Sequence, residues 1–247
     1  SGGAKSAAIG LGGRATINAN HAMLRDPLAQ PCRYDDNPMR QDVEEIGALA
    51  GIHFALNGIL TSTKALVRAI AGNPRAVMES AIPLARAIFE APIATRYELV
   101  IAAAGGHPKD INFYQAQKAL AHASLAVKEG GMVVLVAACP EGIGSRGYER
   151  WMLEHGPTSY AEVFARFEQE GFRVGPHKAL LIARDGSRLS RLWLVSELPP
   201  DTARRLLLTP ASLEEALHAA LMELAPDARI GVMPLANATV PRLEAGV

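Results

Sequence analysis

The stretches ELVIAAAGG, residues 98–106, and MVVLVAA, residues 132–138, decide the fold class of this 247-residue chain. Both are short apolar runs of the kind found in strands that are buried on both faces of a parallel sheet. The residues between them predict a helix from about Asp110 to Glu129, which Gly130-Gly131 would end. A strand, a helix and a second strand in succession indicate an α/β architecture.

The same alternation extends in both directions along the chain. Further helices are expected where apolar residues recur at helical spacing behind a capping residue, at residues 40–49, 74–91, 159–169 and 212–224. Further strands are expected at residues 52–60, 192–196 and 229–234, with a loose tail after the last one. Residues 1–37 are rich in glycine and then in proline, which predicts mostly loop with one short helix.

The predicted fold is therefore α/β, with a mostly parallel sheet and flanking helices. The pattern becomes more regular after Pro92, so we expect two domains, residues 1–91 and residues 92–247, of which the first is incomplete. The chain begins within glycines and without an initiator methionine, which suggests the downstream part of a longer protein.

Composition excludes several classes of protein. Lys and Arg number 25 and so do Asp and Glu, which gives a formal net charge of zero where a nucleic-acid-binding protein carries a basic excess. Hydrophobic residues make up 49% of the chain, too many for a disordered protein, yet no apolar run is long enough to span a membrane. Two cysteines make no disulfide framework. We expect a cytoplasmic globular protein that binds neither nucleic acid nor membrane.

The first candidate site is SGGAKS, residues 1–6, with Asn20-His21 sixteen residues after Lys5. Gly2 and Gly3 would let the backbone approach a ligand closely. A phosphate-binding P-loop is excluded because Ala4 stands where that motif needs glycine. Two interpretations stay open: an ordinary glycine-rich connector, and a relaxed dinucleotide motif formed by Gly10, Gly12 and Ala15 with Asp35 or Asp36.

The second candidate site is GGHPKDINFYQAQK, residues 105–118. A glycine pair that ends an apolar strand and opens into a helix is where open α/β sheets bind ligands. Tyr114, Gln115 and Lys118 share one face of that helix and could hold a carboxylate and a neighbouring hydroxyl. The alternative is a solvated helix face. Cys139, after the next strand, could line the same cleft, although a lone cysteine is usually just buried.

Together these segments resemble the nickel-pincer lactate racemase family. The similarity includes GGHPKDINFYQAQKAL, KEGGMVVLVAACPEGIG, HKALLIAR and the closing VMPLANATVP, besides SGGAKS with Asn20-His21. It implies that residues 1–91 are the remainder of an N-terminal cofactor-bearing domain, and that residues 92–247 are a C-terminal α/β domain closing the active-site cleft. The missing N-terminal half of the same protein would be a partner of this chain.

The resemblance also implies a cofactor and a reaction. Lys5 stands at the position that tethers a nickel-pincer nucleotide, a pyridinium mononucleotide with sulfur substituents, beside Gly2 and Gly3. His21 stands at that of the protein ligand to nickel. Gln115 and Lys118, with Tyr114 beside them, match positions that contact substrate or cofactor. The implied activity is racemisation or epimerisation of a lactate-like 2-hydroxy acid by reversible hydride transfer.

The chain departs from the family pattern at several places. The proton-transferring histidines and a substrate-binding arginine of the family lie upstream of this chain. Ala4 stands where the lactate enzyme has a basic residue, and His177 where it has a tryptophan that contacts the site, so His177 is expected to contact the cofactor. The identity of the 2-hydroxy acid is thus open. Two other functions also stay open: a non-catalytic nucleotide- or metabolite-binding relative, and an NAD-dependent dehydrogenase.

Overall fold

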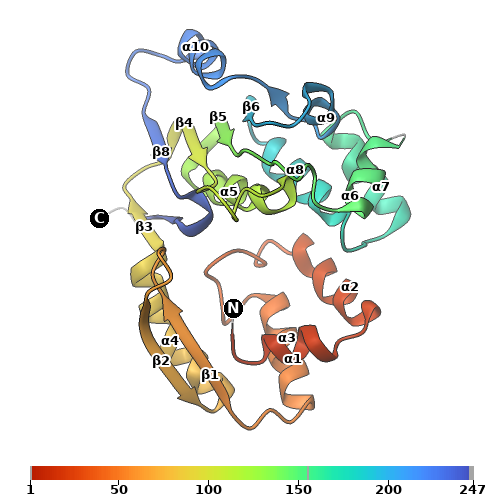
Figure 1. Ribbon diagram of the computed structural model, residues 1–247, viewed down its shortest axis with the longest axis vertical. Helices are drawn as coiled ribbons and strands as arrows, with labels where there is room; N and C mark the ends of the chain where they lie inside the picture. The colour runs from red at the N-terminus through yellow and green to blue at the C-terminus, as the bar shows by residue number, and fades with distance from the viewer. Residues whose placement is uncertain (1, 155, 245–247) are drawn as a thin grey trace. The chain divides into compact units, whose positions relative to one another are not determined.

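The structure is a computed structural model that describes residues 2–154 and 156–244. Ser1, the first residue of the predicted SGGAKS site, lies outside the described residues. The chain divides into two compact units, Ser1–Glu90 (unit 1) and Ala91–Val247 (unit 2), which Figure 1 colours from red to yellow and from yellow to blue. The predicted domain boundary, between residues 91 and 92, falls next to this division.

Unit 1 is helical where a loop was predicted. Its described elements are α1 (Lys5–Leu11), α2 (Arg14–Ala22), η1 (Met23–Arg25), α3 (Pro38–Leu49), β1 (Ala55–Leu60), β2 (Leu66–Gly72) and α4 (Pro74–Phe89), followed at the boundary by β3 (Glu90–Ile93). The prediction of mostly loop before Asn37 is wrong. Alanines and long side chains favour a helix on each side of Gly12-Gly13, and these glycines separate α1 from α2.

The helices expected at residues 40–49 and 74–91 each begin behind an asparagine cap. The Asn37 side chain accepts a hydrogen bond from Arg40 N (3.3 Å), and the Asn73 side chain accepts from Arg75 N (3.0 Å). Each asparagine precedes a proline at the start of its helix, α3 and α4. Pro83 lies inside α4 without ending the helix.

β2 was not predicted from the sequence. It pairs with β1 in an antiparallel hairpin whose register shifts at Leu60, which lies opposite Leu66. Thr61 N donates to Ala65 O (2.9 Å) in the turn, and Lys64 adopts a positive φ of 66° there. Most β2 side chains are exposed, so the apolar alternation that identifies a buried strand is missing from its sequence.

Unit 2 contains the parallel sheet that the sequence predicted. Among the described residues, five strands stand in the order β7-β6-β5-β4-β8, and each neighbouring pair is parallel. The described elements are β4 (Tyr97–Ala103), α5 (Phe113–Ala126), β5 (Val127–Val136), α6 (Arg146–Leu153), α7 (Tyr160–Glu170), α8 (His177–Gly186), β6 (Arg191–Val195), α9 (Pro200–Arg205), β7 (Thr209–Pro210), α10 (Leu213–Glu223), β8 (Ile230–Met233), η2 (Ala236–Ala238) and β9 (Val240–Leu243).

The sheet is buried between helices on both faces. Val100 and Ala102 of β4 join the larger core cluster, which includes residues of α5 and α8, whereas Leu99 joins the smaller cluster with residues of α10. Figure 1 shows α10 on one side of the sheet and α5 and α8 on the other. Alternate residues of one strand thus enter opposite cores, as the two-residue period of a strand requires.

Two expectations about unit 2 are wrong. The helix before β5 ends at Ala126 and not at Glu129, because β5 already begins at Val127 and passes through Gly130-Gly131. There the register against β4 shifts, Gly130 has a positive φ of 70°, and a Cβ on Gly131 would lie 2.9 Å from Glu98 O. The glycines therefore form a strand irregularity and do not terminate a helix.

The segment after β8 is also more ordered than the sequence predicted. The predicted loose tail forms η2 and β9, and β9 pairs with β3. The helix expected at residues 212–224 is α10, which begins with a capping box: Glu215 N donates to Ser212 Oγ (3.1 Å) and Ser212 N donates to Glu215 Oε2 (2.8 Å). Within residues 2–154 and 156–244, no helix combines the length and the apolar character needed to cross a membrane.

Candidate functional site

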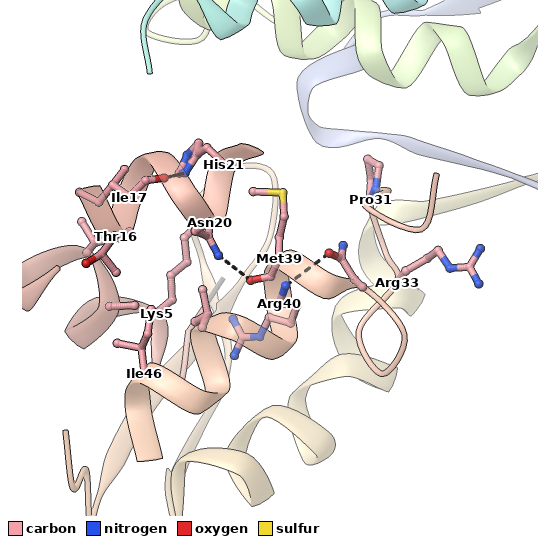
Figure 2. Close-up of a pocket in the computed structure, with 14 residues that line it drawn as sticks. Lys5, Thr16, Ile17, Asn20, His21, Pro31, Arg33, Met39, Arg40 and Ile46 are labelled. Carbon is pink, nitrogen blue, oxygen red and sulfur yellow. Dashed lines mark hydrogen bonds between the residues drawn. The ribbon is translucent and has the colours of Figure 1, made fainter. Parts of the chain in front are cut away.

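Unit 1 contains a cavity of about 650 Å³ that is lined by both Lys5 and His21. Figure 2 shows Lys5 contributed by α1 and His21 by α2. The lining also includes polar side chains from α2, α3 and the loop before α3, namely Thr16, Asn20, Arg33, Asn37 and Arg40. This volume lies within the range of about 300–1,000 Å³ that is usual for small-molecule and cofactor sites.

Gly2 and Gly3 hold the backbone turn that precedes Lys5. Gly3 has a positive φ of 57°, and a Cβ there would lie 2.8 Å from Met78 Cγ. A Cβ on Gly2 would lie 2.1 Å from Asn57 Nδ2. Both glycines permit close packing at the start of α1, and neither is among the described residues that line the cavity. They form the turn immediately before Lys5, in which Lys5 N donates to Gly2 O (3.3 Å).

His21 has a defined ring orientation in α2. Its Nδ1 lies 3.0 Å from Ile17 O, one helical turn earlier. Because a carbonyl oxygen only accepts, Nδ1 carries the hydrogen, and a neutral His21 has its lone pair on Nε2. A backbone carbonyl on one ring nitrogen is the usual way to orient a metal-binding imidazole.

Asn20 fixes α2 against α3. Its Nδ2 donates to Met39 O (2.9 Å) and to Asp42 Oδ2 (2.8 Å), and the residue is buried. Figure 2 shows the contact with Met39 at the edge of the cavity. Asn20 thus sets the position of the helix that carries His21. Its own Nδ2 group already donates to these two acceptors.

The arginines that line the cavity were not predicted from the sequence. Arg40 forms an ion pair with Glu44, donates to Gly2 O (3.2 Å) and lies over the Tyr34 ring, 5.2 Å from its centroid. Arg33 forms an ion pair with Asp36. The four-residue spacing of Arg40 and Glu44 was visible, but in a helix it indicates an ordinary surface pair. Only the packing of α3 brings Arg40 to the cavity.

In unit 2, the structure brings Tyr114, Gln115 and Lys118 together at the start of α5. Lys118 Nζ donates to Gln115 Oε1 (2.6 Å), and Gln115 N donates to the capping Asn112 Oδ1 (3.1 Å). Tyr114 is half-buried, and this burial raises the pKa of its phenol. The shared helix face expected from the sequence is present.

His177 joins this cluster from α8. Its ring lies edge-on to Tyr114, with centroids 6.2 Å apart and planes at 79°. Gly175 N donates to His177 Nδ1 (2.9 Å), so a neutral His177 carries its hydrogen on Nε2. Lys178, the next residue, was not singled out from the sequence, yet its Nζ lies 4.5 Å from the centroid of the Tyr114 ring.

A separate cavity of about 590 Å³ lies at the carboxyl ends of β4, β5 and β6. Gly105 and Gly106 line it together with Asp110, Ser196 and Glu197, as the strand-glycine pattern predicts for an α/β sheet. None of Tyr114, Gln115, Lys118 and Cys139 is among its described lining residues. Cys139 is buried, and this burial, with Asp110 and Glu197 nearby, raises the pKa of its thiol to about 12.

The dinucleotide motif considered for Gly10, Gly12 and Ala15 lacks its structural context. Gly10 lies inside α1 and Ala15 inside α2, and no strand precedes them among the described residues. The motif requires a strand, a glycine turn and a helix in succession. Nor does the described part of the chain group three or more His, Cys, Asp or Glu residues in a metal-binding arrangement.

The parallel sheet with a cavity at the carboxyl ends of its strands places unit 2 in the class of open α/β domains, which bind ligands at this edge of the sheet. The sequence model of the lactate racemase C-terminal domain family matches residues 93–240. The chain belongs to the lactate racemase family, as its sequence motifs suggested.

Two curated relatives are named lactate racemase. The one from Thermoanaerobacterium thermosaccharolyticum is 28% identical over 242 residues, which cover 95% of this chain and 56% of the relative. The one from Lactiplantibacillus plantarum is 30% identical over 150 residues, which cover 60% of this chain and 35% of the relative. The chain thus spans about half or less of the length of these relatives.

Solved structures agree with the fold. The lactate racemase apoprotein from Thermoanaerobacterium thermosaccharolyticum superposes with a TM-score of 0.83 at 25% identity, covering 92% of this chain and 55% of that one. A Thermotoga maritima protein superposes with a TM-score of 0.60 at 14% identity, covering 85% of this chain and 54% of that one, and supports the fold alone.

Proposed function

We propose that this chain is the cofactor-holding and substrate-binding part of a racemase or epimerase of a lactate-like 2-hydroxy acid. In this proposal Lys5 tethers a nickel-pincer nucleotide and His21 is the protein ligand to its nickel. The observation that supports it most directly is that Lys5 and His21 line one cavity of about 650 Å³. The curated relatives named lactate racemase support the reaction class.

The residues of the cavity fit such a group. An imidazole with its lone pair on Nε2 suits Ni(II), and the described side chains include no complete metal-binding cluster, so further ligands would belong to the bound cofactor. Arg33 and Arg40 place guanidinium groups in the wall, each paired with a carboxylate, Asp36 and Glu44, and their remaining N–H donors suit a nucleotide phosphate. When bound, the pyridinium ring would supply an acceptor for hydride from the substrate.

The cluster in unit 2 would bind the substrate. Lys118, held by Gln115, offers an ammonium to the carboxylate of the 2-hydroxy acid, and this attraction persists through both half-reactions because the carboxylate keeps its charge. Removing the α-hydrogen as hydride while the hydroxyl loses a proton avoids a carbanion beside a carboxylate. His177 Nε2–H gives the site a ring N–H donor, as the indole of the family's tryptophan would.

The base that takes the hydroxyl proton is assigned to a part of the protein outside this chain. The chain spans about half of the length of the relatives that it matches. In the described cluster of Tyr114 and Lys118, His177 is the one histidine. We therefore propose that the N-terminal half of the same protein completes the active site. A cytoplasmic location remains a prediction of the sequence.

Intact-mass spectrometry tests the tether. Protein produced in cells that make the cofactor is expected to carry an added mass, which Lys5→Ala abolishes and Lys64→Ala, a change at an exposed lysine of the same unit, preserves. His21→Ala is expected to keep the added mass and to lose nickel in elemental analysis. An unmodified Lys5 in such cells would overturn the proposal and favour a non-catalytic binding relative.

A further inference from the structure

Lys178 is a buried lysine within the cluster of Tyr114, Gln115 and Lys118. It is the second residue of α8, and only 7% of its surface is exposed. Its Nζ lies over the Tyr114 ring, 4.5 Å from the centroid, where the negative face of the ring attracts an ammonium. Tyr114 and Lys118 lie one turn apart on α5, so the two lysines approach the same patch from two helices.

The immediate surroundings of Lys178 supply no opposite charge. In the described part of the chain, no carboxylate forms an ion pair with this lysine and no acceptor takes a hydrogen bond from its Nζ. Burial, and then the charge of Lys118, lower the pKa of Lys178 to about 8. A buried ammonium beside a second ammonium is unfavourable unless an anion joins them.

The position of Lys178 is fixed by contacts between α5 and α8. Gln117 Nε2 donates to Lys178 O (2.8 Å), and both residues are buried. His177 is held by Gly175 N and packs edge-on against Tyr114. Because the backbone on each side of Lys178 is anchored, its ammonium is held in place before any ligand arrives, which favours binding.

We propose that Lys178 is a further substrate-binding residue and that, together with Lys118, it selects a 2-hydroxy acid bearing a second carboxylate. This inference rests on the proposed function, in which Lys118 binds the first carboxylate. A substrate with a single carboxylate would leave the buried charge of Lys178 uncompensated, whereas a dicarboxylate matches two ammonium groups with two negative charges. The dicarboxylate is selected because Lys178 is desolvated in the complex with either acid, and only a second carboxylate compensates its charge.

Two different anions could compensate the charges of Lys118 and Lys178. The phosphate of a nucleotide cofactor is also a dianion and could compensate the same two charges. We favour the substrate because Tyr114, Gln115 and Lys118 are the residues assigned to substrate, whereas the arginines assigned to phosphate line the cavity of unit 1. Inorganic phosphate is therefore included as a probe.

Calorimetric titration of the chain with 2-hydroxysuccinate, lactate and inorganic phosphate, at one ionic strength, tests the proposal. We expect 2-hydroxysuccinate to bind more tightly than either of the others. Lys178→Met is expected to weaken its binding at least about tenfold, the usual effect of losing a hydrogen bond to a charged group. Lys178→Arg is expected to retain most of it, and Lys128→Met, at an exposed lysine of the same unit, all of it.

Three results would overturn the proposal: lactate binding as tightly as 2-hydroxysuccinate, phosphate binding more tightly than both, or Lys178→Met leaving the order unchanged. If Lys178→Met does not fold, the unmutated chain still decides, because the NMR-detected pKa of Lys178 must rise when 2-hydroxysuccinate binds. An unchanged value contradicts the proposal. Binding is measured without turnover, so a chain that binds 2-hydroxysuccinate through Lys178 but never acquires the Lys5 adduct refutes only the proposed function.

Discussion

The two units differ in how they bury their side chains. Unit 2 encloses its sheet between helices, with large side chains that are fully buried, such as Phe113, Leu120 and Tyr148. Unit 1 buries mostly small or medium side chains, namely Ala4, Ala8, Ala29, Tyr34, Ile59, Val77, Met78 and Ala81. It also exposes large apolar ones, among them Ile9, Leu11, Leu49, Phe54, Leu56 and Leu66.

This difference shows that the two parts of the proposed site are held in place by different forces. Tyr114 and Lys178 are positioned by a packed core in which α5 and α8 are anchored to the sheet and to each other. Lys5 and His21 lie on short helices with little core beneath them, and polar contacts such as those of Asn20 take a larger share. Unit 1 is therefore expected to be the more easily disturbed of the two.

The largest expected effect is on independent folding. A fragment of residues 91–247 is expected to unfold cooperatively on heating, because its apolar core is complete within the unit. A fragment of residues 1–90 is expected to show no cooperative transition, since it buries little apolar surface. Circular dichroism melting curves of both fragments measure this. A sharp transition in the 1–90 fragment would contradict the comparison.

A smaller effect, on the free energy of unfolding, is expected when one leucine in each unit is replaced by alanine. Leu120 in α5 is fully buried, whereas Leu56 in β1 is 69% exposed. Leu120→Ala is expected to lower the free energy of unfolding by about 3 kcal/mol, from lost burial and the cavity left behind. Leu56→Ala is expected to change it by less than about 0.5 kcal/mol. Urea denaturation of the whole chain measures both, and equal losses would refute the difference in packing.

The two cysteines extend the comparison to chemical reactivity. Cys32 of unit 1 is exposed and Cys139 of unit 2 is buried. Partial desolvation and the nearby Glu90 raise the pKa of the Cys32 thiol, and burial raises the pKa of the Cys139 thiol to about 12, so Cys139 stays protonated at pH 8. Iodoacetamide at pH 8 is expected to modify Cys32 first and Cys139 only after denaturation. Mass spectrometry of tryptic peptides measures the order, and early labelling of Cys139 would show that unit 2 opens readily.

The smallest effect concerns the acid stability of unit 2, through Glu98 near the start of β4. An ion pair with Lys128 and a hydrogen bond from Arg229 N (2.9 Å) lower the pKa of Glu98 to about 2. Since the unfolded value is about 4.3, ionised Glu98 stabilises the fold at neutral pH, and this contribution falls as the pH drops from about 5 to about 2.

Glu98→Gln is therefore expected to lower the melting temperature slightly at pH 7 and to make no difference near pH 2. Melting curves at both values measure this, with Glu129→Gln as a control at a more exposed carboxylate that pairs with Arg188. A uniform loss at every pH would assign Glu98 a role in packing instead.

The sequence predicted the elements whose signals are local. Asn37, Asn73 and Ser212 cap helices within three residues of themselves, and most residues of the apolar runs 98–104 and 132–138 lie in β4 and β5, which are buried on both faces. The prediction was wrong where one local signal is compatible with two different structures. Gly130-Gly131 can end a helix or bend a strand, and only pairing with β4 decides for the strand.

For the candidate site, the sequence by itself determined which reactive groups exist and that Tyr114, Gln115 and Lys118 share a helix face, because helical spacing fixes that geometry. The tertiary structure alone decided that Lys5, His21 and Arg40 line one cavity and that Lys178 is buried against Tyr114. Those juxtapositions join residues far apart in the chain, and burial depends on which helices pack together. No local pattern encodes them.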